Sequence, residues 1–375
     1  LAFVIMLYIF QINSLTGGFS KIERTYIAST SSFGQIFSET VFMPHKLLSL
    51  GANAISENSN YARFPSAIIM IFMIICFYVL MERWYTRRIA LLSTLLFATS
   101  SWTLTIGRQA LPTVLYFSWL PILALLYWTT SKSKNYLSIF LWVLSLTLAF
   151  YVPGLLWFVV VLAASQRQRL RRILVQTPRW QTVLCLLLFI ILTIPFIYSA
   201  VQSPLLVLQS LGLPSKLSQI TGFPSRLLDI FSQIFVYSSG NPVFHIGHLP
   251  YLDVSTILLF IIGLYRLRYS SARKIMNWSG LITIGLLIGV GSSAVNIAIF
   301  IPLIYVFAGS GISFLLVQWF RVFPKNPIAR IFATSAMTIV VLLISFYHLS
   351  RYYIAWPLNP ATKSVFSNTD GKIEE

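Results

Sequence analysis

The sequence predicts an all-α fold: a bundle of about eleven membrane-spanning helices with further helices at the membrane surface. Of the 375 residues, 57% are hydrophobic and only 10% are charged, against roughly 25% charged in an ordinary globular protein. The mean hydropathy is +0.79. The apolar residues form runs close to the length that crosses a bilayer, which is about 20 residues for a helix. This composition excludes a water-soluble, disordered or disulfide-rich protein.

The predicted spans follow from these apolar runs. They cover residues 1–13, 64–81, 89–106, 114–130, 136–150, 154–164, 181–198, 251–266, 278–291, 297–318 and 331–348. The first run is shorter than a full span and looks truncated. The runs 136–150 and 154–164 meet at Pro153 and Gly154, so they are either two short helices or one long kinked helix. We expect residues 1–350 to form one transmembrane domain, followed by a short outer tail, 351–375.

Basic residues predict the orientation. The net charge is +18, but Lys and Arg gather at the ends of apolar runs, as topology determinants do, and not in a nucleic-acid-binding patch. With eleven spans, every short basic loop lies on one side, which the positive-inside rule identifies as the cytoplasm. We therefore expect a multi-pass protein of the cell membrane, in contact with lipid and without a nucleic-acid partner.

Two long segments, 14–63 and 199–250, then lie on the outer face. Within them, residues 33–50 and 223–237 place apolar side chains at helical spacing among polar neighbours. Both patterns are typical of helices that lie in the membrane interface with the apolar side down. The alternative is an amphipathic helix packed on the bundle.

Acidic residues are few, and Glu23 is the strongest catalytic candidate among them. It follows the first span in the string Gly17-Gly18-Phe19-Ser20-Lys21-Ile22-Glu23. A carboxylate at the outer surface can activate a hydroxyl as a general base. The structural alternative is that Glu23 completes a capping box with Ser20, which precedes it by three residues.

Basic side chains on the outer face are candidates for binding a phosphate. Arg63 and Arg108 lie at the outer ends of spans, where a guanidinium group can bind phosphate through two hydrogen bonds. Their alternative role is to anchor the chain at lipid headgroups. The further outer cations are Lys46, Lys216, Arg226 and Arg351.

The sequence predicts no metal or cofactor. His45, His245 and His248 lie in the outer segments without a nearby cysteine, and a metal site needs more ligands than this. No Asp-x-Asp pair, phosphate-binding loop or dinucleotide fingerprint occurs. Cys76 and Cys185 both lie in apolar runs, which argues against a disulfide.

Several of these strings resemble a known family. They are Arg63-Phe64-Pro65-Ser66-Ala67 at the start of the second span, the basic loop 82–88, Phe97-Ala98-Thr99-Ser100, and Gly107-Arg108-Gln109-Ala110. Over about residues 1–180 the chain is similar to membrane glycosyltransferases of the GT-C fold, in the protein mannosyltransferase and aminoarabinose transferase branch. In that family an Asp-Glu pair follows the first span. Here Ile22 stands at the place of the Asp, and only Glu23 remains.

The resemblance implies a function at the outer face. It implies a polyprenyl-phosphate sugar as donor, an outer-face acceptor of unspecified identity, and a first-loop acid that takes the acceptor's proton. We therefore expect a glycosyltransferase with Glu23 as the base. A transporter or flippase of lipid-linked glycans is the alternative, although transporters usually carry ionisable groups inside their spans. A catalytically silent relative is a third hypothesis, because the Asp is missing at Ile22.

Overall fold

Helices account for all the regular structure that the computed structural model describes. The described residues are 2–55, 61–131, 136–165, 167, 168, 171, 178–214, 223–238, 240–267 and 296–366, and no strand occurs among them. Several of the helices are long and apolar. The chain is therefore a helical membrane protein, as the composition predicts.

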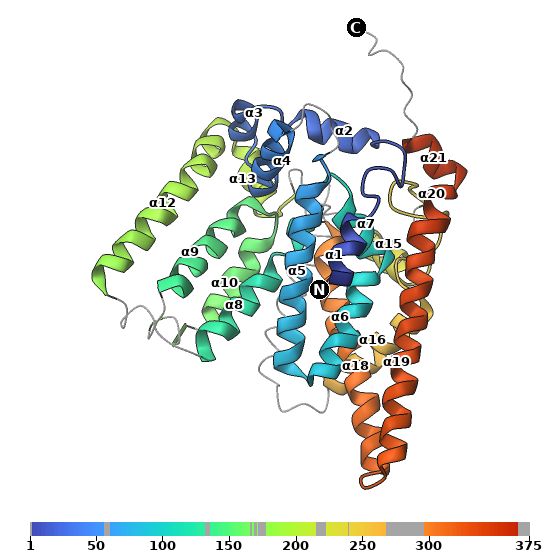
Figure 1. Ribbon diagram of the computed structural model, residues 1–375. Coiled ribbons are helices and arrows are strands. Elements are labelled where there is room, and N and C mark those ends of the chain that lie inside the picture. The colour runs from blue at the N-terminus through green and yellow to red at the C-terminus, as the bar shows by residue number, and fades with distance from the viewer. Residues whose placement is uncertain are drawn as a thin grey trace.

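A bundle of apolar helices forms the centre of the molecule (Figure 1). Its members are α5 (Phe64–Trp84), α6 (Arg87–Thr99), α7 (Ser101–Arg108), α16 (Val254–Leu267), α18 (Ile301–Val322) and α19 (Pro327–Ser350). Aromatic rings from three of them meet in the core. Phe77 of α5 stacks on Phe97 of α6 with ring centroids 4.5 Å apart, and Phe97 lies 5.7 Å from Tyr305 of α18.

Two glycines bring α16 and α18 into backbone contact. A Cβ atom at Gly263 would lie 1.9 Å from the carbonyl oxygen of Phe307, and one at Gly311 would lie 2.1 Å from that of Leu259. Small residues allow this close approach, which is common between helices in membranes. The glycine-rich span predicted at 278–291 lies outside the described residues.

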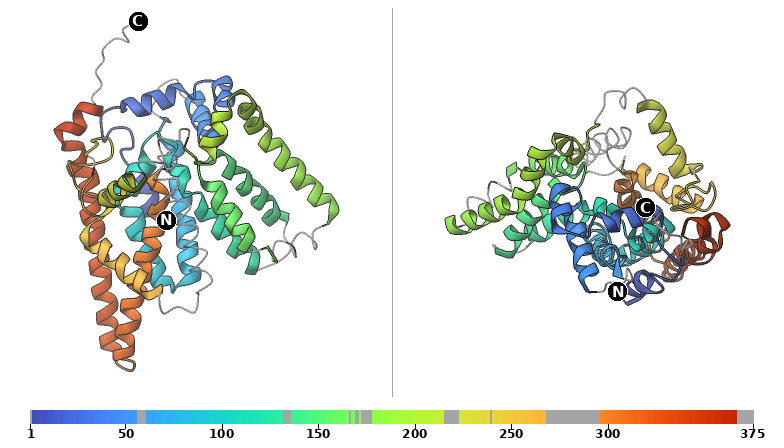
Figure 2. Two further views of the ribbon diagram at one scale, coloured as in Figure 1. Left: turned by 180° about the vertical axis from the view of Figure 1, so that it is seen from behind. Right: turned by 90° about the horizontal axis from the view of Figure 1, so that it is seen from above.

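A second group of helices stands beside the bundle, next to α5 (Figures 1 and 2). It consists of α8 (Trp119–Ser131), α9 (Tyr136–Tyr151), α10 (Leu155–Ser165) and α12 (Arg179–Gln202), and the short helix η2 (Pro112–Phe117) precedes it in the chain. The helices α9 and α10 are separate, and the chain turns between them with Gly154 at φ +77°. This is the two-helix alternative, because glycine adopts such a backbone conformation without steric cost.

Four helices are long and apolar enough to cross a membrane, and a bent pair makes five. The four are Phe64–Trp84, Arg179–Gln202, Ile297–Val322 and Pro327–Leu358, and the pair is α6 with α7, bent by 61° at Ser100. Four other predicted spans correspond to apolar helices of 10–17 residues, which is short for a bilayer crossing. The first predicted span contains only α1 (Ala2–Ile9). The count of eleven thus stays a prediction.

Short helices cover one end of the molecule, which we call the roofed end (Figure 1). They are α2 (Lys21–Ala28), α3 (Phe33–Ser38), α4 (Met43–Ile55) and α13 (Pro204–Ser210). The turns between α5 and α6 and between α18 and α19, which carry basic residues, lie at the opposite end. These two predicted inner loops thus lie at one end of the molecule and the first predicted outer segment lies at the other.

Both amphipathic segments form helices. Residues 33–50 give α3 and most of α4, and α15 (Phe223–Phe235) occupies the later segment. On α15 the side chain of Ile234 is buried while Leu228 is 70% exposed. Beyond α19 the chain continues through the π-helical turn η4 (Arg351–Ala355), α20 (Trp356–Leu358) and α21 (Pro360–Phe366).

Candidate functional site

Glu23 lies at the start of α2 and is fully buried. Gly17, at φ +73°, turns the chain ahead of this helix. Ser20 is the N-cap: its hydroxyl accepts a hydrogen bond from the Glu23 backbone N–H, and the Glu23 carboxylate accepts one from the Ser20 backbone N–H. The capping box that the Ser20–Glu23 spacing predicts is therefore present.

Arg63 at the start of α5 pairs with this carboxylate. Its Nε lies 3.0 Å from Glu23 Oε1 and its Nη2 lies 3.2 Å from Oε2. The backbone N–H of Ala110 also donates to Oε1, and the Ser20 hydroxyl donates to Oε2. With the bond from the Ser20 backbone N–H, the two oxygens accept five hydrogen bonds. Since a carboxylate offers about four lone-pair sites, none is left for the proton of an acceptor.

The Arg63 guanidinium is likewise occupied by groups of this chain. Besides Glu23, it donates to the carbonyl oxygens of Ile12 and Gly18 and to the hydroxyl of Thr16. The Phe19 ring lies 4.7 Å away. Arg63 thus ties the segment that follows α1 to the start of α5, and this arrangement leaves it little capacity for a phosphate.

Arg108, at the end of α7, lies near the same segment with partners of its own. Its Nη1 and Nη2 donate to the carbonyl oxygens of Leu7 and Phe10 at the end of α1, at 2.5 and 2.7 Å. Nη1 also donates to the Tyr353 hydroxyl, and the rings of Tyr352 and Tyr353 flank the guanidinium. A cation at these last carbonyls stabilises the end of a helix.

The remaining predicted cations lie elsewhere. Lys46 on α4 forms an ion pair with Glu39 at 3.1 Å and donates to the Glu39 carbonyl oxygen. Arg226 is half-buried on α15, and Lys216 lies outside the described residues. The structure therefore joins Glu23 to Arg63, sets Arg108 beside the same loop, and pairs Lys46 with a different acid.

The predicted outer histidines do not form a metal centre within the described part of the chain, where no group of three potential ligands occurs. His45 lies on α4 and bonds Tyr26 and Ser66 at 2.8 Å each. Burial lowers the pKa of His45 to about 3, so its ring is neutral. His248 bonds the backbone oxygen of Ser238.

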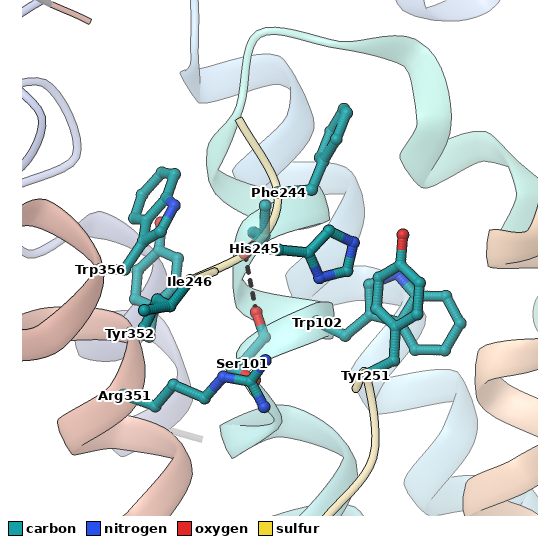
Figure 3. A pocket seen from close by; sticks show the side chains of 10 residues that line it. Ser101, Trp102, Phe244, His245, Ile246, Tyr251, Arg351, Tyr352 and Trp356 are labelled. Carbon is teal, nitrogen blue, oxygen red and sulfur yellow. Dashed lines mark hydrogen bonds between the residues drawn. The ribbon is translucent and has the colours of Figure 1, made fainter. Parts of the chain in front are cut away.

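A pocket with polar walls opens between α7, the loop at 244–251 and the end of α19 (Figure 3). It has about 280 Å³ of space between atoms, including its open mouth. The enclosed part has room for about one water molecule or one hydroxyl group. Its lining residues are Ser101, Trp102, Thr105, Phe244, His245, Ile246, Tyr251, Arg351, Tyr352 and Trp356.

Three features of the lining bear on ligand binding. Trp102 and Tyr251 stack with ring centroids 3.8 Å apart. His245 is 2% exposed, and its Nδ1 has no hydrogen-bond partner. Burial and the nearby Arg351 lower the pKa of His245 to about 4. Arg351 itself donates to the carbonyl oxygens of Pro250 and Leu249.

Beside the pocket, three side chains form a hydrogen-bonded chain. Ser101 Oγ lies 3.2 Å from His348 Nδ1, and His348 Nε2 lies 2.9 Å from Asp253 Oδ1. Neither Ser101 nor His348 belongs to a motif that the sequence predicts. The three residues come from three elements and are up to 247 positions apart, so no local motif could have joined them.

Comparisons with known proteins give no family for this chain. No family model matches it, and neither a curated protein nor a solved structure does.

Proposed function

We propose that the protein is a membrane glycosyltransferase that moves a sugar from a polyprenyl-phosphate donor to an acceptor hydroxyl on the outer face of the cell membrane. The observation that carries the proposal is the pocket, which is lined by a guanidinium group (Arg351), a neutral imidazole with an unpaired nitrogen (His245) and a hydroxyl (Ser101), beside stacked aromatic rings. The sequence resemblance supplies the donor class.

The chemistry of the donor suits these groups. Departure of the polyprenyl phosphate leaves negative charge on its oxygens, and a guanidinium group stabilises such charge. Aromatic faces stack on sugar rings. The unpaired nitrogen of the neutral His245 can form one hydrogen bond with a sugar hydroxyl, either as donor or as acceptor. A lipid-borne donor at the membrane surface needs no nucleotide site, and the chain carries no nucleotide-binding motif.

Glu23 takes a supporting role in this proposal. Its carboxylate holds Arg63 and the Ala110 backbone in place. It would become a base only after Arg63 or Ser20 had released one of its oxygens. The described spans contain no continuous path of charged residues, so they do not support the alternative function of lipid-linked-glycan transport.

Reconstitution tests the proposal. Purified protein in proteoliposomes is given a panel of radiolabelled polyprenyl-phosphate hexoses and pentoses, with a cell-envelope extract as the acceptor source. We expect label to leave the donor and polyprenyl phosphate to appear. Release from none of the donors, or movement of intact donor across the bilayer without acceptor, would overturn the proposal.

A matched pair of variants ties activity to the pocket. Arg351→Gln removes the guanidinium from the lining, and we expect turnover to fall by about 10-fold or more, because a hydrogen bond to a charged group contributes about 1.5–3 kcal/mol. Arg330→Gln removes an exposed arginine at the opposite end of the molecule and should leave turnover unchanged. Equal turnover in the two variants would exclude Arg351 from the site.

A further inference from the structure

The chain of Ser101, His348 and Asp253 joins the pocket to a half-buried carboxylate. Ser101 is the first residue of α7, His348 lies in the last turn of α19, and Asp253 immediately precedes α16. Ser101 is 8% exposed and lines the pocket, whereas His348 is 1% exposed and lies behind it. A polar path thus runs from the pocket wall into the bundle.

The carboxylate at the inner end fixes the direction of the hydrogen bonds. Burial opposes ionisation of Asp253, but hydrogen bonds from His348 and Thr256 outweigh it and lower its pKa to about 2. An ionised carboxylate only accepts hydrogen bonds. The carboxylate thus favours a hydrogen on His348 Nε2, and in the neutral ring this leaves the Nδ1 lone pair facing the Ser101 hydroxyl.

This order of carboxylate, imidazole and hydroxyl is the one by which serine hydrolases activate an O–H group, with the two ring nitrogens exchanged. The titratable groups that surround the pair include Tyr347, whose ring packs against His348, and Arg351 and Tyr305, on which the Asp253 charge acts electrostatically. Among the described residues, Asp253 is the carboxylate bonded to the imidazole.

The unfilled part of the pocket matches a hydroxyl group in size. It has room for about one water molecule, and both Ser101 and His245, whose Nδ1 has no hydrogen-bond partner, line it. An acceptor can therefore present a single O–H there while the rest of it stays at the mouth. Glu23 offers no comparable opening, because it is fully buried and its oxygens are already bonded.

We propose that Ser101, His348 and Asp253 form the proton-accepting site for the acceptor hydroxyl, with Ser101 as the catalytic residue that touches the acceptor. This inference rests on the proposed function. As the acceptor oxygen attacks the anomeric carbon, its proton passes to Ser101 Oγ and the Ser101 proton passes to His348 Nδ1. The new bond joins the acceptor oxygen to the anomeric carbon.

The bond from the anomeric carbon to the phosphate oxygen breaks in the same step, and its electron pair leaves on the polyprenyl phosphate. Charge is conserved, because the imidazolium formed at His348 balances the negative charge gained by the leaving group. Asp253 stabilises the imidazolium, and the proton then returns to solvent. His348 and Asp253 are positioning residues in this scheme, since they act through Ser101.

Spectroscopy tests the geometry without any substrate. The chain has four histidines, so protein labelled with ¹⁵N only in histidine gives few imidazole signals, and His348→Gln identifies those of His348. We expect the His348 ring to carry its hydrogen at Nε2, which faces Asp253, and we expect Asp253→Asn to change its shifts. A ring protonated at Nδ1 would overturn the proposal, because Ser101 could not then donate to it.

Kinetics test the role, using whichever donor of the panel the wild type consumes. We expect Ser101→Ala and His348→Gln to lower kcat by about 100-fold or more, the range for lost general-base catalysis, with the donor KM changed less than about threefold. Ser101→Thr keeps the hydroxyl and should recover much of the rate. Ser100→Ala is the matched control: it removes the neighbouring hydroxyl, which does not line the pocket.

Recovery of kcat by Ser101→Thr, together with a nearly unchanged donor KM, separates proton transfer from structural support. If the wild type transfers sugar and Ser101→Ala matches its kcat, the relay is wrong and the proposed function stands. If the wild type transfers from no donor, the function fails and the relay fails with it. If the Ser101 variants do not fold, the tautomer of the wild-type His348 ring decides whether the proposal stands.

Discussion

Replacing Glu23 with glutamine separates its structural role from the catalytic role that the sequence resemblance implies. The change keeps the shape of the side chain but removes its charge and turns one acceptor oxygen into a donor. In the structure, both oxygens accept hydrogen bonds, from Arg63, Ser20 and the Ala110 backbone. The amide would point N–H groups at other donors, and Arg63 would remain buried without its counter-ion.

The expected cost follows from this loss. Removing one partner of a buried ion pair costs about 3–5 kcal/mol, which is a large share of the roughly 5–15 kcal/mol that stabilises a typical domain. We expect the apparent Tm of Glu23→Gln in detergent to fall by on the order of 5–10 °C. In a double-mutant cycle with Arg63→Gln, the two losses should be less than additive by about 0.5–3 kcal/mol.

Glu39→Gln is the matched control. Glu39 also pairs with a cation, Lys46, but its side chain is 54% exposed, so the same substitution should cost less than about 1 kcal/mol. Thermal unfolding and sugar transfer are measured on the same preparations. A Glu23→Gln protein that melts with the wild type yet transfers no sugar would refute this reasoning and assign Glu23 as the base.

Three further expectations concern packing, pH and anchoring. Gly263→Ala should destabilise the fold by about 1–3 kcal/mol through overpacking against α18, whereas Gly51→Ala, with open space at its Cβ position, should not; thermal unfolding compares them. Burial holds His45 and His245 neutral, with pKa values of about 3 and 4. Their full contribution to the free energy of unfolding is therefore present above pH 6.5, and at lower pH the free energy of unfolding falls by about 1.4 kcal/mol per pH unit for each histidine. Chemical unfolding in mixed micelles at pH 7.5 and 5.5 measures this loss, and His45→Gln should remove its share. Arg108→Lys should lower the Tm, because a single ammonium group cannot replace the fork that binds the Leu7 and Phe10 carbonyls, while Arg330→Lys should not.

The fold was predictable in class and in its long elements. Runs such as 64–81 and 331–348 became single long helices, because an apolar stretch of that length has few alternatives to a spanning helix. The break between α9 and α10 was visible as Pro153-Gly154, although sequence alone left two alternatives. The bend at Ser100 was not foreseen, since no proline or glycine marks it.

The site was predictable only in part. The Ser20–Glu23 capping box is a local motif of three-residue spacing, and the sequence pointed to it directly. The pairing of Glu23 with Arg63 joins residues 40 positions apart, and only the resemblance had directed attention to both. His348, at the end of the last predicted span, was not predicted as a site residue, because a single histidine in a sequence does not indicate which residues it will contact.

The amino-acid sequence by itself determined that this chain is a helical membrane protein and that the two basic turns after α5 and α18 lie at one end of it, because hydropathy and charge act over local stretches of chain. Tertiary structure decided which ionisable groups are already bonded and which face a pocket. Those properties depend on contacts between α2, α5, α7, α16 and α19, which are distant in sequence. In the low-dielectric interior each buried polar group must then form hydrogen bonds with the groups that packing places beside it.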